Sequence, residues 1–133
     1  MSRQETFDWD LRVRYAETDQ MGVTYYGNYL VWFEVARTEY FRSKGVVYTD
    51  IEKDGLYLAV AESRCRYLAP TRYDDVVTIR TWISRLGLTS IHFSYEVLNK
   101  QSGQKIAEGS TSHVFVNRGM RPMRIPEEVL RAF

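Results

Sequence analysis

The sequence lacks paired cysteines, an excess of one charge and long apolar runs. It has one cysteine, Cys65, which excludes an internal disulfide and a metal site built from several cysteines. Its 18 basic and 17 acidic residues nearly cancel, which argues against a strongly electrostatic nucleic-acid binder. No run reaches the roughly 18 apolar residues of a membrane span, and the first ten residues contain no apolar signal-peptide core. We therefore expect a cytoplasmic protein without a membrane span.

Length and aromatic content indicate the fold class. We expect residues 1–133 to form a single domain, because this length supports one sizeable core and leaves little room for a second. Aromatic residues make up 14% of the chain, and they suit the half-buried face of a pleated sheet. The composition therefore favours a β-rich domain.

Alternation of apolar and polar residues predicts most of the strands. Residues 7–15 alternate without interruption, which is a strong strand pattern. Turn-forming residues such as Gly87 and Gly103 then divide the second half of the chain. The other predicted strands are residues 56–68, 76–86, 90–98 and 105–117, with a short edge strand at 120–125.

Two short helices are expected beside these strands. Thr49 and Glu52 have the spacing of a capping box, and Gly55 would end the helix that they begin. Pro126 is suited to the first position of a final helix that runs to Phe133, because proline needs no hydrogen-bond partner for its nitrogen there.

A long helix is predicted over residues 28–44. Asn28 is suited to be its N-cap and Gly45 to be the left-handed residue that ends it. About 17 residues at 1.5 Å each give a rod of roughly 25 Å. Residues 29–33 are apolar all round, which predicts burial, whereas the helix becomes polar from Arg37 onward. An apolar helix and an amphipathic antiparallel sheet can cover each other in an α+β domain.

Three motifs carry a resemblance to a known family. They are R-x-x-Y-x-E-T-D-x-x-G-V-x-Y-x-x-N-Y at residues 12–29, E-x-A-R-T-E-Y at 34–40 and Y-x-x-P-x-x-Y-D-D at 67–75. The chain resembles the hotdog-fold acyl-CoA thioesterases, and within them the 4-hydroxybenzoyl-CoA thioesterase group and its relatives of the bacterial Tol–Pal cluster. The resemblance implies a long central helix wrapped by a curved antiparallel sheet of about five strands.

The same resemblance implies an activity and an assembly. It predicts hydrolysis of an acyl-CoA thioester to free acid and CoA without a cofactor or metal. It also predicts a homodimer whose active sites lie between protomers, with further pairing into a tetramer. Two alternatives stay open: a thioesterase acting on acyl carrier protein, and a non-catalytic acyl-CoA-binding protein that tolerates loss of its loop acid.

Asp19 is the predicted catalytic carboxylate. A carboxylate can attack a thioester carbonyl or activate water, and N–H groups at a helix N-terminus can stabilise the oxyanion. The resemblance assigns that donor role to the backbone of Tyr26. A purely structural role for Asp19, as a turn residue in a polar loop, is the alternative. The resemblance and the loop position suggest five substrate-binding residues: Tyr15, Gly22, Val23, Gly27 and Asn28.

Other ionisable residues are given structural roles. We expect Glu34 to be partly buried and paired with Arg37, and both Glu34 and Glu39 to be structural, although another branch of the fold uses a helix-borne acid. Residues 73–75 are interpreted as a turn, and Tyr15 otherwise as a core residue. Basic candidates for the CoA phosphates, each also explicable as a solvated residue, are Arg64, Arg66, Arg118 and Arg121.

The two histidines do not suggest a reaction of their own. His92 and His113 lie in predicted strands and form no metal-ligand pattern with Cys65, so we expect them to be satisfied sheet residues. No histidine lies near the start of the predicted long helix, which argues against a hotdog dehydratase.

Overall fold

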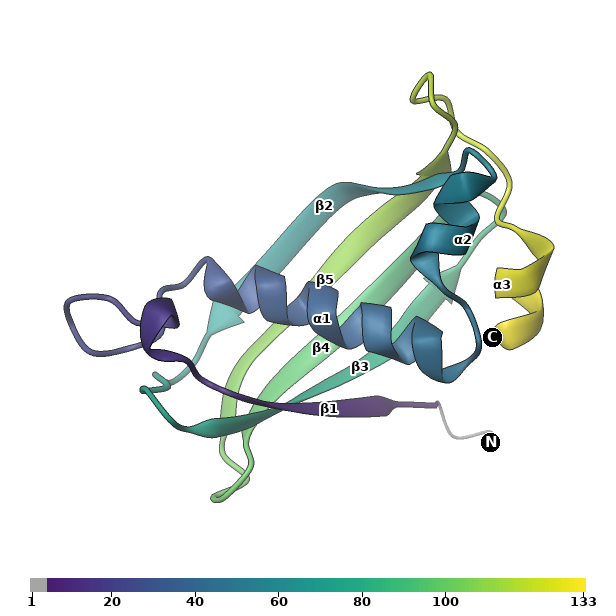
Figure 1. Cartoon of the computed structure of the whole chain (residues 1–133). Coiled ribbons are helices and arrows are strands. Elements are labelled where there is room, and N and C mark those ends of the chain that lie inside the picture. Colours follow the sequence, from purple (N-terminus) through teal and green to yellow (C-terminus); the bar gives the residue numbers. More distant parts are fainter. Residues whose placement is uncertain (1–4) are drawn as a thin grey trace.

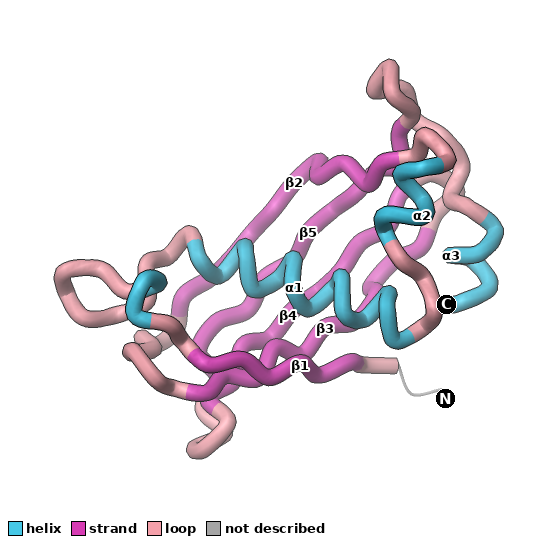
Figure 2. Tube along the Cα trace, viewed as in Figure 1, coloured by secondary structure: helices cyan, strands magenta, loops and turns pink. Residues whose placement is uncertain are grey.

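One curved antiparallel sheet wraps the long helix α1 (Asn28–Ser43) in the computed structural model, which describes residues 5–133 (Figure 1). The tube view shows α1 lying across the inner face of the sheet, with the two short helices at one end (Figure 2). The five strands, in spatial order, are β1 (Phe7–Arg12), β3 (Val76–Leu86), β4 (Ser90–Asn99), β5 (Lys105–Val116) and β2 (Tyr57–Tyr67). The predicted α+β hotdog architecture is confirmed.

Burial along α1 follows the period of a helix that packs on a sheet. Tyr29, Trp32, Phe33, Ala36 and Tyr40 are buried at spacings of three or four residues, so they form one face. Alternate residues of the central strands supply the opposing surface. The buried strand residues include Val77, Ile79, Ile91, Phe93, Tyr95, Val97, Ile106 and Phe115.

The ring of Phe33 on α1 packs directly against the backbone of Gly109 in β5. The ring of Phe33 stacks on Tyr95, with 4.2 Å between ring centroids and 9° between planes. A Cβ added to Gly109 would lie 2.6 Å from Phe33 Cε2 and 2.4 Å from the carbonyl oxygen of Arg64. Only a residue without a side chain allows the ring and the neighbouring strand this close to β5.

The predicted burial of α1 is corrected at several positions. Leu30 is 38% exposed and Val31 is 47% exposed, so the apolar first turns of the helix are not buried on every side. Arg37, expected to begin a polar solvated half, is buried. Leu30 and Val31 are exposed because they lie beside β2, at an edge of the sheet that no other described strand covers. Arg37 is buried because it lies close to the core residues Tyr95 and His113.

Several predicted boundaries also change. The first strand ends at Arg12, and Tyr15–Glu17 form one turn of 3-10 helix instead of continuing the strand. Asn28 is the first residue of α1, with Gly27 as the N-cap, and no side chain of residues 5–133 caps the helix. At the helix end Gly45 has the predicted positive φ, +79°.

The short elements need similar corrections. Helix α2 (Tyr48–Lys53) begins after Val47, so Thr49 lies inside it and the predicted capping box does not form. Pro126 is the N-cap of α3 (Glu127–Ala132) rather than its first residue. The predicted edge strand at 120–125 reduces to an isolated bridge between Val116 and Pro122. None of the helices within residues 5–133 is long and apolar enough to cross a membrane.

Candidate active site

Asp19 lies in a tight loop between the 3-10 turn η1 (Tyr15–Glu17) and α1, and it shapes that loop. Its N–H donates to the carbonyl oxygen of Val23 at 2.9 Å, and its Oδ1 accepts the N–H of Met21 at 2.9 Å. Gly22 at the tip has a φ of +79°. The predicted turn role is therefore real. Since Oδ1 alone makes that contact, Oδ2 has no hydrogen-bond partner among the described residues and stays available to a ligand.

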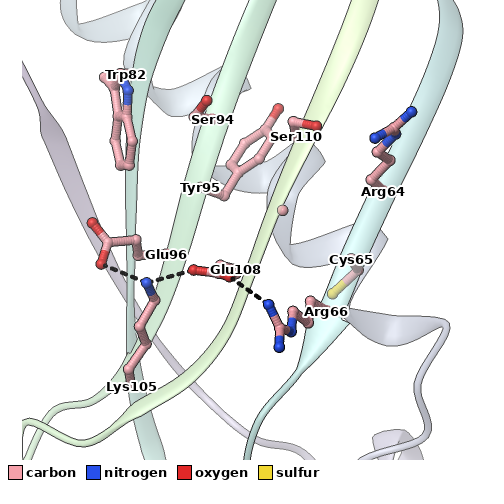
Figure 3. A pocket seen from close by; sticks show the side chains of 11 residues that line it. Arg64, Cys65, Arg66, Trp82, Ser94, Tyr95, Glu96, Lys105, Glu108 and Ser110 are labelled. Carbon is pink, nitrogen blue, oxygen red and sulfur yellow. Dashed lines mark ion pairs between the residues drawn. The ribbon is translucent and has the colours of Figure 1, made fainter.

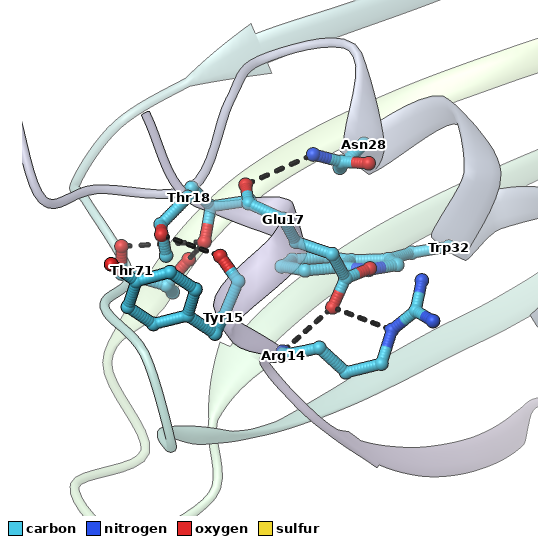
Figure 4. Close-up of polar contacts among 8 residues, drawn as sticks. Arg14, Tyr15, Glu17, Thr18, Asn28, Trp32 and Thr71 are labelled. Carbon is cyan, nitrogen blue, oxygen red and sulfur yellow. Dashed lines mark hydrogen bonds and ion pairs between the residues drawn. The ribbon is translucent and has the colours of Figure 1, made fainter. Parts of the chain in front are cut away.

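Glu17 fixes this loop to the helix (Figure 4). The side chain is buried, and its Oε2 accepts the indole N–H of Trp32 at 2.8 Å. Its Oε1 accepts the N–H of Arg14 at 2.8 Å. The backbone carbonyl of Glu17 accepts the N–H of Tyr25 at 2.8 Å and the side-chain amide of Asn28 at 3.0 Å. Both ends of the loop are thereby held to α1 by one residue.

Hydroxyl groups hold the other side of the loop. Thr24 Oγ1 and Thr71 Oγ1 are 2.6 Å apart, and the Tyr29 hydroxyl lies 3.1 Å from Thr71 Oγ1. The N–H of Thr24 also donates to the carbonyl oxygen of Thr71 at 2.8 Å. Thr24, Tyr29 and Thr71 are all buried, so these bonds are shielded from water.

A cleft of about 370 Å³ opens beside Asp19. Asp19, Val23 and Tyr26 line it together, as the sequence predicts for three of the site residues. Its remaining wall comes from both sides of the loop and from the end of β2: Met21, Thr24, Tyr29, Tyr67, Leu68, Ala69 and Pro70. The cleft thus combines one carboxylate with a largely apolar and aromatic wall.

Two backbone donors at the start of α1 are unpaired. The N–H groups of Tyr26 and Gly27 make no hydrogen bond within residues 5–133, whereas the next N–H, that of Asn28, donates to the carbonyl oxygen of Tyr25 at 3.0 Å. Gly27 already has helical dihedral angles, with φ −64° and ψ −22°. Free N–H groups at a helix start favour developing negative charge. An oxyanion formed near Tyr26 would therefore be stabilised there.

The other predicted substrate-binding residues contribute no side chain to the wall of the cleft. Tyr15 is 77% exposed, with its ring edge-on to Tyr73 at 5.7 Å between centroids, so its interpretation as a core residue is wrong. Gly22 is at the loop tip. A Cβ at Gly27 would lie 3.0 Å from the ring of Tyr25, and the side chain of Asn28 is used in holding Glu17. Gly22, Gly27 and Asn28 thus shape the loop in this chain.

A comparison with protein families matches almost the whole chain, including the segment that forms this cleft. A model of the thioesterase-like superfamily matches residues 13–133. The chain belongs to this superfamily. This thioesterase-like chain is 36% identical over 109 residues to YneP of Bacillus subtilis, named as a candidate acyl-CoA thioesterase, covering 82% of the chain and 78% of YneP. It is 30% identical over 128 residues to the acyl-CoA thioester hydrolase YbgC of Escherichia coli, covering 96% of the chain and 95% of YbgC.

Solved structures of thioesterases share the fold. DHNA-CoA thioesterase from Staphylococcus aureus superposes with a TM-score of 0.86 at 34% identity, covering 90% of this chain and 80% of its own. A 1,4-dihydroxy-2-naphthoyl-CoA thioesterase from Synechocystis gives 0.91 at 22% identity, covering 96% and 95%, which supports the fold alone. The predicted resemblance to hotdog thioesterases is confirmed, and the Tol–Pal branch stays a prediction.

Glu34, the alternative acid, lies in a different place. It is exposed and forms no ion pair with Arg37 within the described chain, so the predicted pair is wrong. It lines a cavity of about 250 Å³ between α1 and β2, together with Leu30, Val31, Val60 and Arg37. The structure therefore separates Glu34 from the wall that contains Asp19.

The histidine beneath Arg37 is neutral. His113 is fully buried, and this burial, with the nearby charge of Arg37, lowers its pKa from 6.5 to about 3. Its Nε2 lies 2.7 Å from Thr111 Oγ1, and the Tyr95 hydroxyl is 2.6 Å from the same oxygen. His113 lies in a strand, β5, as the sequence predicts, but it is not fully satisfied, because its Nδ1 has no partner in the described part of the chain.

The arginines proposed for phosphate binding differ in their surroundings. Arg64 and Arg66 lie on the outer face of the sheet beside a depression of about 720 Å³ (Figure 3). Arg64 pairs with Glu62 at 2.6 Å, and Arg66 is 3.9 Å from Glu108, which also pairs with Lys105. Because acids offset these cations, the outer face is not a free basic patch. Arg118 and Arg121 are exposed in the loop after β5, at the end of the sheet away from Asp19 (Figure 1).

Proposed function

We propose that this chain hydrolyses acyl-CoA thioesters at the cleft beside Asp19, and that residues 1–133 act as one thioesterase domain. The observation that carries the proposal is the presence of an unpaired carboxylate oxygen and unpaired N–H groups at the same loop. The names of the relatives YneP and YbgC support the substrate class. A cytoplasmic location stays a prediction of the sequence.

Asp19 can drive hydrolysis in two ways. As a nucleophile, its Oδ2 bonds to the thioester carbon, the C–S bond breaks, and CoA leaves as a thiolate that takes a proton from water. A second water then cleaves the mixed anhydride, which releases the acid and restores Asp19. As a general base, Asp19 removes a proton from the water that attacks the same carbon, and the C–S bond then breaks as CoA leaves and takes up that proton. In both cases the N–H of Tyr26 stabilises the oxyanion.

A second copy of this chain fits the edge of the sheet at β2. That strand pairs only with β5 among the described strands, so its outer edge carries unpaired backbone groups. Apolar side chains beside it are exposed: Leu30, Val31 and Val60, at 38%, 47% and 54%. A homodimer that pairs β2 with its symmetry mate would bury both features, and a tetramer would join two such dimers.

The dimer is tested by mass in solution. Sedimentation or light scattering should give twice the 15.7 kDa of one chain, or four times it for the tetramer. Val60→Glu should shift the mass toward one chain, because a carboxylate on that apolar strip loses its hydration on pairing. Thr49→Glu, at an exposed helix position, is the matched control. A wild-type mass of one chain would rule the dimer out.

The activity is tested by release of free thiol from a panel of aliphatic and aromatic acyl-CoAs. Turnover of at least one ester by the wild-type chain is the expected outcome, and its kcat/KM values rank the substrates. Acyl carrier protein esters belong in the same panel, because a chloroplastic acyl-acyl carrier protein thioesterase of Arabidopsis thaliana is 27% identical over 97% of the chain. No release from any CoA ester would contradict the proposal.

A further inference from the structure

We propose that Tyr67 is a positioning residue for the proposed thioester hydrolysis: its hydroxyl fixes the peptide unit that presents the Gly27 N–H as a second oxyanion donor. The inference rests on the proposed function of the Asp19 cleft. The inference adds to that site a second donor, the Gly27 N–H, and the residue that holds it, Tyr67, which lies 40 residues after Gly27.

The hydrogen bond is direct. Tyr67 Oη donates to the carbonyl oxygen of Tyr26 at 3.0 Å. That carbonyl and the N–H of Gly27 belong to one planar trans peptide unit, so they point in opposite directions and turn together. A bond that fixes the carbonyl therefore fixes the direction of the N–H. The Gly27 N–H itself has no partner in residues 5–133.

The preceding peptide unit is held in the same manner. The carbonyl oxygen of Tyr25 accepts the N–H of Asn28 at 3.0 Å, which fixes the unit that contains the Tyr26 N–H. Two successive peptide units thus have bonded carbonyls and free N–H groups. The Tyr25 carbonyl is held by α1 alone. The Tyr26 carbonyl accepts the N–H of Tyr29 from α1 at 3.3 Å, and Tyr67 adds a second and shorter bond at 3.0 Å from outside the helix.

Tyr67 is well supported for this role. It is the last residue of β2, where it pairs with Ala107 of β5, so its backbone belongs to the sheet. Its ring packs edge-on against Tyr29 at 5.1 Å and Tyr26 at 6.4 Å between centroids. Desolvation of the hydroxyl raises its pKa to about 12, which keeps it protonated as a donor at neutral pH. A side chain held by strand and ring contacts can orient a donor with little freedom.

A hydroxyl removal tests the role. Tyr67→Phe keeps the ring and its contacts. It should lower kcat about tenfold while KM stays nearly constant. The loss is smaller than the roughly 10²–10³-fold fall in kcat for removal of a whole oxyanion donor, because the Gly27 N–H remains and is only less well oriented. Tyr73→Phe is the matched control, since it removes a hydroxyl from a ring that is 56% exposed against 45% for Tyr67 and that makes no hydrogen bond to the helix start. It should keep the wild-type kcat.

Two further measurements separate positioning from packing. A thioether analogue of the acyl-CoA, which has no carbonyl oxygen, should bind wild type and Tyr67→Phe equally. In the substrate-free protein, Tyr67→Phe should shift the backbone ¹⁵N resonance of Gly27, because a bonded carbonyl polarises the next nitrogen, while Gly22 stays unshifted.

Each outcome has one meaning. A kcat for Tyr67→Phe within twofold of wild type would overturn the positioning role while leaving the proposed function intact. If Tyr67→Phe bound the thioether analogue more weakly than wild type, by the same factor as its loss in kcat/KM, Tyr67 would act by packing alone. A wild-type chain that hydrolyses no acyl-CoA would overturn the proposed function and, with it, this inference. An unchanged Gly27 resonance would show that the hydrogen bond does not act on that peptide unit.

Discussion

Asp19→Asn should lower kcat for acyl-CoA hydrolysis by about 10²–10⁴-fold, or roughly 3–5 kcal/mol of transition-state stabilisation. An amide can neither attack the thioester carbon nor accept a proton from water at neutral pH. The substitution keeps the local structure, because an amide oxygen at this position can still accept the N–H of Met21 that Asp19 Oδ1 accepts at 2.9 Å. The loss should appear in kcat with little change in KM.

Folding and charge are controlled separately for this variant. Thermal unfolding of Asp19→Asn should match wild type, and Asp54→Asn, which removes an exposed carboxylate beyond the end of α2, should keep full activity. Asp19→Asn retaining kcat within tenfold of wild type would remove Asp19 from the chemical step. Glu34, which lines the neighbouring cavity along α1, would then be the next acid to replace.

Gly109→Ala should lower the free energy of unfolding by about 3 kcal/mol, the upper end for one added methyl group in a packed core. Its Cβ would lie 2.4 Å from the Arg64 carbonyl oxygen and 2.6 Å from the Phe33 ring. The first of these neighbours is backbone of a paired strand and cannot rotate away. The midpoint of thermal unfolding should fall by about 10 °C in a domain of this size.

A second substitution shows where the strain arises. Gly109→Ala should cost less in a Phe33→Leu background, because the smaller side chain removes one of the two contacts, and the coupling follows from a double-mutant cycle. Ser110→Thr adds a methyl group one residue further on, beside the depression on the outer face, and should leave stability nearly unchanged. A midpoint for Gly109→Ala equal to that of wild type would mean that the sheet can move away from α1.

Local sequence patterns predicted where the strands lie better than they predicted the surroundings of individual residues. The predicted bounds 76–86 match β3, and burial alternates over residues 76–82 by strand geometry alone, before the irregularity between Ile83 and Arg85. The same reasoning failed at residues 13–15, where the chain leaves the sheet for the turn η1 that brings Glu17 to Trp32. That turn depends on a contact with a residue 15 positions later, which alternation does not contain.

The candidate site was predicted only where its residues are close in sequence. Asp19, Val23 and Tyr26 share one loop, so motif and spacing identified them together. Glu17 was overlooked, although an acid three residues after Arg14 has the spacing of a local cap, and Tyr67 was noted only as part of a motif. The exposed side of α1, Leu30 and Val31, could not be predicted from the helix, because its cover depends on what lies beyond β2.

Glu17 also defines how much of this chain behaves as one transferable unit. Its bonds run to Arg14 before the loop and to Tyr25, Asn28 and Trp32 after it. A chimera that exchanges Glu17 with the loop but keeps the original Asn28 and Trp32 would leave these donors facing a foreign acceptor. Exchange of residues 14–32 as a block would transfer the loop, Glu17 and the first turns of α1 together. This is the smallest graft that keeps every bond of Glu17 and the position of the Asp19 carboxylate at the cleft.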